Sequence, residues 1–206
     1  MPGACSTISE ILSESLWKYG KGTKWLTEPL IAWVISEKCQ AVLGDAEEGT
    51  ADHHLRLRTE PSDEVVALTK LICALVDHSS EWIAAHMLQS EVQAFLRVIL
   101  RLTEWGGYGG VDERVSEVWD RKMTTHNQLT LAVFPLIQEA LMDSPSFQAP
   151  HEVSPDWAIA KSFFRESVGV IQRKARYPED VSAWDRDEAE SFDIWRRDAG
   201  EVIVCA

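Results

Sequence analysis

The sequence predicts an all-α fold, and specifically an α-solenoid of HEAT-type antiparallel helix pairs. Apolar residues recur at helical spacing through most of the 206 residues, whereas alternating runs joined by hairpin turns are almost absent. Polar and Pro/Gly-containing loops group the helices into pairs that recur at roughly 50 to 60 residues, a spacing typical of helical repeats. A compact helical bundle with long loops is the competing architecture.

The first expected pair, residues 7–43, has recognisable helix ends. Thr7-Ile8-Ser9-Glu10 fits a capping box, and Gly20 follows the last apolar position of this helix. Pro29 suits the first turn of a second helix, which we expect Gly44 to stop. The polar, acidic stretch 45–61 is then expected to form an exposed loop.

Similar signals define the second pair, residues 63–104. Ser62 or Asp63 can cap its first helix, whose apolar pattern can continue as far as Met87. Ser90 starts the partner helix, and Trp105-Gly106-Gly107 is expected to break it.

A third pair is expected at 112–174, followed by one further helix at 185–206, so that 1–206 forms a single repeat segment. Pro135 lies inside the apolar run of Leu129–Met142 and should kink or break it. Residues 143–154 read as a loop, after which Pro155 and Asp156 open another helix.

The charge balance limits the classes of partner. Lys and Arg total 20 against 33 Asp and Glu, which gives a formal net charge of −13. Such a surface repels phosphate backbones, so direct nucleic-acid binding is disfavoured and basic proteins are the better candidates. The simpler alternative is that the acidic residues only maintain solubility.

The cysteine pattern favours a reduced, intracellular protein. Cys5, Cys39, Cys73 and Cys205 form no C-x-x-C pair, and Cys39 and Cys73 lie in apolar helical patterns where a free thiol acts as a small core residue. The N-terminal residues lack a signal-peptide pattern, and no apolar run approaches the roughly 18 residues of a membrane span.

Candidate chemistry is sparse, so we predict a protein that is not an enzyme and needs no metal or cofactor. His53-His54 has no ligand at helical spacing, and His78 and His86 do not form an H-E-x-x-H motif. Asp77-His78-Ser79 contains the residue types of a catalytic triad, but adjacent residues rarely have triad geometry, which requires three side chains that converge in space. The Gly106–Gly110 loop lacks the strand and the Lys of a phosphate-binding loop.

Three segments carry a family resemblance. The first is Gly106–Glu117, GGYGGVDERVSE, which leads into Leu129–Leu141, LTLAVFPLIQEAL. The second, Lys174–Asp198, resembles a following repeat, and the third and weaker one, Leu68–Leu88, resembles the helix that precedes this glycine-rich turn. In order and spacing these segments resemble the importin-β superfamily, in the branch of importin thirteen and transportin-SR. The residues that match in Lys174–Asp198 are Tyr177-Pro178, Trp184, Asp187-Glu188, Phe192, Trp195, Arg197 and Asp198.

Two departures from this family stand out. Val118–Gln128 interrupts an otherwise continuous segment and fits either a surface insertion or a retained intron, and we expect it to bulge between helices. The chain is also several times shorter than such receptors and resembles their middle, whereas their Ran-binding repeats lie at the N-terminus. Ran binding is therefore expected only of a full-length receptor.

The resemblance implies a fragment of a nuclear transport receptor, present in nucleus and cytoplasm, with protein cargo and Phe-Gly nucleoporins as partners and with no direct nucleic-acid or membrane contact. A HEAT-repeat scaffold for a multiprotein complex is the alternative. Trp105 and Tyr108 could anchor a partner, although sealing the junction between repeats is the simpler interpretation. The candidate partner-binding residues are Trp105, Tyr108, Asp112, Glu113 and Glu117.

Overall fold

The structure, a computed structural model, describes residues 3–5, 7–8, 10, 24–48, 62–104, 129–144, 155–176, 182 and 186–205. Within these residues the chain is helical and contains no strand, which confirms the prediction of an all-α fold. None of the described helices is long and apolar enough to cross a bilayer. The main helices are α2 (Lys24–Val34), α3 (Glu37–Glu48), α5 (Asp63–Ala85), α6 (Ser90–Glu104), the π-helix η1 (Leu129–Val133), α8 (Phe134–Met142), α10 (Pro155–Lys174) and α11 (Arg186–Cys205).

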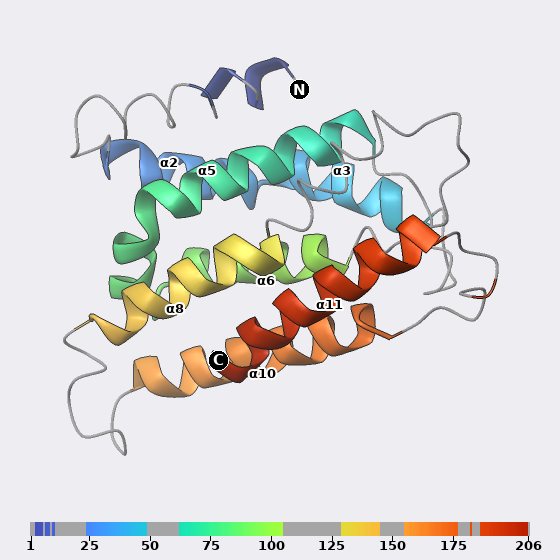
Figure 1. The fold of residues 1–206 in the computed structure, drawn as a ribbon. Coiled ribbons are helices and arrows are strands. Elements are labelled where there is room, and N and C mark those ends of the chain that lie inside the picture. The colour runs from blue at the N-terminus through green and yellow to red at the C-terminus, as the bar shows by residue number, and fades with distance from the viewer. Residues whose placement is uncertain are drawn as a thin grey trace.

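The helices form two layers, one in front of the other in Figure 1. The front layer contains α5, η1 with α8, and α11; α5 packs on α8, and η1 packs on α11. The rear layer contains α2 with α3, then α6 and α10; α2 packs on α6, and α6 packs on α10. Front helices run from right to left in this view and rear helices from left to right. This arrangement is compatible with an α-solenoid.

The N-terminal helix ends were predicted wrongly. Helical residues begin already at Gly3, and the Thr7 hydroxyl donates to the Gly3 carbonyl at 2.9 Å instead of capping a helix. The next helix begins at Lys24, so Pro29 lies inside α2 and not in a first turn. Gly44 does not stop α3, which continues to Glu48, so the predicted loop can begin only after that residue.

The break between α2 and α3 has a local cause that the apolar pattern did not reveal. The Ser36 hydroxyl donates to the Trp33 carbonyl at 2.6 Å, and the Ser36 amide donates to the same oxygen at 3.1 Å. The Ser36 carbonyl then accepts from the amides of Cys39 and Gln40, which start the next helix. A serine side chain that competes for backbone groups in this way favours a helix boundary.

Helices α5 and α6 follow the sequence prediction closely. Ser62 caps α5, and its hydroxyl accepts from the Val65 amide at 3.3 Å. The helix continues to Ala85 with a kink at Ser79, where φ is −131° and ψ is 16°. After a short turn α6 starts at Ser90, as predicted. The predicted break at Trp105-Gly106-Gly107 lies outside the described residues.

Pro135 separates two kinds of helix in the front layer. Residues Leu129–Val133 form the π-helix η1, and α8 follows directly with Pro135 near its start. The chain stays helical through Val133, whose φ is −67° and ψ is −45°, so the predicted kink or break takes the form of a change of helix type. Helix α10 begins at Pro155 and ends at Lys174, the residue at which the third pair was expected to end.

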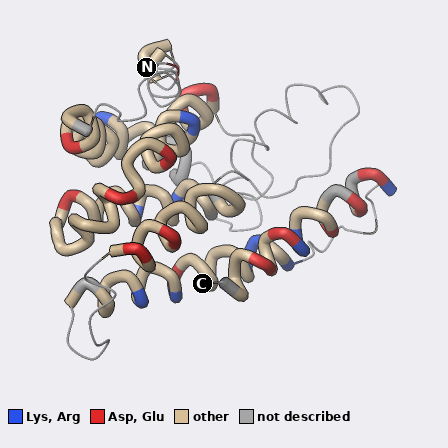
Figure 2. Tube along the Cα trace, turned by 60° about the vertical axis from the view of Figure 1, so that its left-hand side comes forward, with Lys and Arg blue, Asp and Glu red and all other residues tan. Residues whose placement is uncertain are grey.

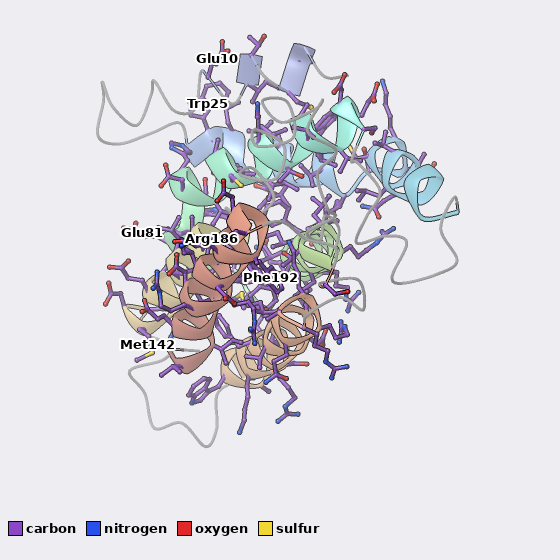
Figure 3. The ribbon with its side chains drawn as sticks, turned by 45° about the vertical axis from the view of Figure 1, so that its right-hand side comes forward. Glu10, Trp25, Glu81, Met142, Arg186 and Phe192 are labelled. Atoms are coloured by element: carbon purple, nitrogen blue, oxygen red, sulfur yellow. The ribbon has the colours of Figure 1, made fainter. Side chains whose placement is uncertain are left out.

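The core lies between the two layers. Phe134 on α8 and Phe163 on α10 place their ring centres 5.7 Å apart, and Phe192 on α11 stacks near Trp195 at 5.9 Å. Figure 3 shows Phe192 directed into the interior, whereas Trp25 and Met142 lie on the outside. The largest fully buried side chains are Phe95, Phe134, Phe192, Ile31, Leu43, Leu68, Leu71, Ile72, Leu75, Ile83 and Met87.

Candidate functional site

The predicted partner-binding residues Trp105, Tyr108, Asp112, Glu113 and Glu117 all lie outside the described residues. The same holds for the Gly106–Gly110 loop, for Val118–Gln128 and for His53-His54. Their proposed roles stay predictions.

The triad-like run Asp77-His78-Ser79 does not converge on a common point. Asp77 is exposed, whereas His78 and Ser79 are buried. The Ser79 hydroxyl lies 2.6 Å from that of Thr27 on α2, so its role is to join two helices. In the described part of the chain, no group of three or more His, Cys, Asp or Glu is placed to hold a metal ion.

A groove between α6 and α10 is the best candidate site in the described structure. It has a volume of about 480 Å³, and its floor is formed by Leu100 and Val170, both nearly buried. Four arginines surround this floor together with one glutamate and one glycine: Arg97, Arg101, Arg165, Arg173, Glu166 and Gly169. Such a concentration of positive charge is unexpected in a chain whose net charge is −13.

Two of the arginines are held in position by neighbours. The Arg101 Nη1 donates to the Gln40 Oε1 at 2.6 Å, which ties α6 to α3. The Arg173 guanidinium lies close to Gly169: a Cβ atom added to this glycine would be 3.5 Å from the Arg173 Nη1. Glycine at this position therefore leaves the groove open beside Arg173, whereas a long side chain such as leucine would extend into it.

The groove continues toward the start of both helices. A second hollow of about 150 Å³ shares Arg97, Leu100 and Glu166 with the first. Its remaining lining is mostly apolar or neutral: Gln93, Leu96, Ile159, Ser162 and Phe163. The Ser162 hydroxyl donates to the Glu166 Oε1 at 3.2 Å, so this glutamate is already engaged with its own helix. One end of the groove is thus basic. The other end, called the apolar end here for Leu96, Ile159 and Phe163, also exposes polar side chains.

The charge distribution supports this assignment. Most Lys and Arg positions of the described helices lie in the C-terminal half, toward the bottom of Figure 2, whereas acidic positions occur on helices throughout. Helix α10 alone carries Lys161, Arg165, Arg173 and Lys174. The basic groove is therefore a local feature of α6 and α10.

Sequence reasoning missed this groove, although a signal was present. Arg97 and Arg101 are four residues apart, and Arg165 and Arg173 are eight apart with Gly169 midway, so each set lies on one helix face. The pattern becomes meaningful only when α6 and α10 are known to be neighbours.

A second unusual group lies at the contact between α10 and α11. Lys174 is only 5% exposed, and its Nζ has no hydrogen-bond acceptor among the described residues. The nitrogen lies 5.7 Å from the centre of the Trp195 ring on α11. Burial lowers the pKa of Lys174 to about 7, because the interior disfavours the charged ammonium.

No protein-family model, curated protein or solved structure matches this chain. The site therefore has to be interpreted from its own chemistry. An open groove bordered by guanidinium groups is chemically suited to binding an anionic group.

Proposed function

We propose that this chain is a protein-binding segment of an α-solenoid and that it does not act as an enzyme. The observation that carries the proposal is the regular stacking of the two layers, in which α5, α8 and α11 run one way while α2–α3, α6 and α10 run the other (Figure 1). Helix pairs that repeat in one direction create long continuous surfaces, and repeat proteins use these surfaces to bind other proteins.

Within this class we propose a nuclear transport receptor as the parent protein. The support is the sequence resemblance of Leu129–Leu141 and Lys174–Asp198 to the importin-β superfamily, segments that include η1, α8 and most of α11. The implied partners are protein cargo and Phe-Gly nucleoporins, with Ran binding reserved for the full-length receptor. A basic cargo suits the net charge of −13.

A pull-down on immobilised Phe-Gly repeats tests the transport role. The purified chain should be retained by the repeats and lost when every Phe in them is replaced by Ser. Retention on both resins would indicate non-specific adsorption, and retention on neither would remove the support for a transport role.

The alternative function is a helical scaffold that organises a multiprotein complex. It shares the stacked architecture but gives no reason for Phe-Gly binding. Two results together would favour the scaffold. The chain would not be retained by Phe-Gly repeats, and it would co-purify from cells in a stoichiometric complex whose composition does not depend on whether the Ran GTPase is bound to GTP.

A further inference from the structure

We propose that the groove between α6 and α10 binds an acidic peptide segment of a partner protein, with one aliphatic side chain placed a few residues from the carboxylates. This inference does not depend on the transport role, because it rests only on the chemistry and shape of the groove.

The basic end of the groove selects carboxylates. Arg97 and Arg101 come from α6, and Arg165 and Arg173 come from α10, so guanidinium groups border the groove on both sides. A guanidinium can bind a carboxylate through two parallel hydrogen bonds, which makes arginine the preferred residue for such recognition. Glu166 is the only acidic residue of this lining, and it accepts from Ser162.

The groove is partly organised before a ligand arrives. Gln40 fixes Arg101, and Arg173 lies along its own helix over Gly169. Side chains that are already ordered lose less conformational entropy on binding, which favours affinity. The open space above Gly169 lets a peptide backbone or a short acidic side chain approach Arg173.

The apolar end explains why we include an aliphatic residue. The hollow of about 150 Å³ beside Leu96, Ile159 and Phe163 suits a single leucine- or methionine-sized side chain. Phe163 and Arg173 are ten residues apart on α10, a separation of about 15 Å at 1.5 Å per residue. An extended peptide spans that distance with about five residues. The expected ligand therefore has a leucine about five residues from its acidic group.

Nucleic acid is the competing polyanion. The overall charge of −13 opposes a long phosphate chain, whereas a short acidic peptide meets only the basic groove. Discrimination between the two classes is therefore part of the test.

Fluorescence anisotropy with the full chain tests the proposal. The probe is a fluorescein-labelled peptide in which a leucine precedes three consecutive glutamates by five residues. We expect saturable binding that weakens as the salt concentration increases, and weaker binding when the glutamates become glutamine or the leucine becomes asparagine. The proposal would be overturned if a single-stranded RNA oligonucleotide displaced the labelled peptide as effectively as the unlabelled peptide does.

Two kinds of variant separate charge from shape. Arg97→Glu with Arg165→Glu changes two exposed residues and should weaken binding at least about tenfold. Gly169→Leu keeps all four arginines but fills the groove, and should weaken binding by a similar factor. Gly169→Ala adds only an ordinary van der Waals contact and should keep affinity within about threefold.

The charge-matched control is Lys38→Glu with Lys70→Glu, two exposed lysines on α3 and α5 outside the groove. It should leave the affinity within about twofold at physiological salt. Two results would refute the assigned site. One is an equal loss of peptide affinity in the groove and control variants. The other is no loss of affinity in the groove variants while circular dichroism shows intact helices.

Discussion

The Lys174 Nζ lies 5.7 Å from the centre of the Trp195 ring, inside the contact between α10 and α11. The cation–π attraction offsets only part of the cost of removing an ammonium from water, because such contacts contribute about 0.5 to 2 kcal/mol. The desolvation cost is larger, which is why the pKa of this lysine falls to about 7. Lys174 is therefore a source of instability in the fold.

Replacing Lys174 by methionine should stabilise the protein at neutral pH by about 1–3 kcal/mol, because an apolar chain of similar length then fills the same space. Urea denaturation followed by circular dichroism measures the change. Lys161→Met on the same helix is the matched control, since Lys161 is exposed and should give a change within about 0.5 kcal/mol.

The pH dependence of the same pair provides a second check. Because the pKa of Lys174 is about 7 in the folded protein and 10.5 in an exposed lysine, the unfolded chain binds one more proton between these values. The free energy of unfolding of the wild type should therefore rise with pH through this range, and the advantage of Lys174→Met should shrink from pH 7 to pH 10. A constant difference between the two proteins would contradict the lowered pKa.

The buried Thr27–Ser79 hydrogen bond should couple α2 to α5. Thr27→Val or Ser79→Ala alone leaves a buried hydroxyl without its 2.6 Å partner and should cost about 1–3 kcal/mol. The double variant should cost less than the sum of the two single variants, which a double-mutant cycle measures. Thr103→Val is the control, because the Thr103 hydroxyl bonds only to the Ile99 carbonyl of its own helix.

Gly200→Ala should stabilise the protein by about 0.5–1 kcal/mol, because glycine loses more conformational entropy in a helix than alanine does. Gly200 lies within α11, and a Cβ there would meet nothing within 4 Å. Thermal unfolding measures the effect. The reverse change, Ala158→Gly on the exposed side of α10, should destabilise the protein by a similar amount. A loss of stability in Gly200→Ala would show that residue 200 has no room for a methyl group.

Helix α11 should promote self-association, because it exposes two large apolar side chains to solvent. Ile194 is 45% exposed and Val204 is 86% exposed. Light scattering coupled to size-exclusion chromatography should show a mass that grows with protein concentration. Ile194→Asp with Val204→Asp should reduce that growth, whereas Met142→Asp on α8 should not. A wild type that stays monomeric at high concentration would contradict the prediction.

The Ser62, Ser90 and Pro155 helix starts were predictable because each depends on local chemistry. The Ser62 hydroxyl accepts from the Val65 amide three residues later, and the first-turn Pro155 has no amide to lose. The Ser90 hydroxyl instead donates to the Glu91 carboxylate at the start of α6. Thr7, Pro29 and Gly44 give similar local signals, yet the structure uses none of them as predicted. Packing of an apolar face contributes more than a single glycine costs, so α3 can continue through Gly44.

The sequence by itself determined the all-helical class, most helix starts and the change of helix near Pro135, because periodicity, capping and proline sterics act over a few residues. Only the tertiary structure decided the arginine groove and the burial of Lys174. Arg97 and Arg165 are far apart in the chain and become neighbours only when α6 packs on α10. In the sequence, Lys174 looks like any other charged residue of an amphipathic helix. Its burial results from packing against α11, because desolvation depends on the groups that surround a side chain in space and not on its neighbours in sequence.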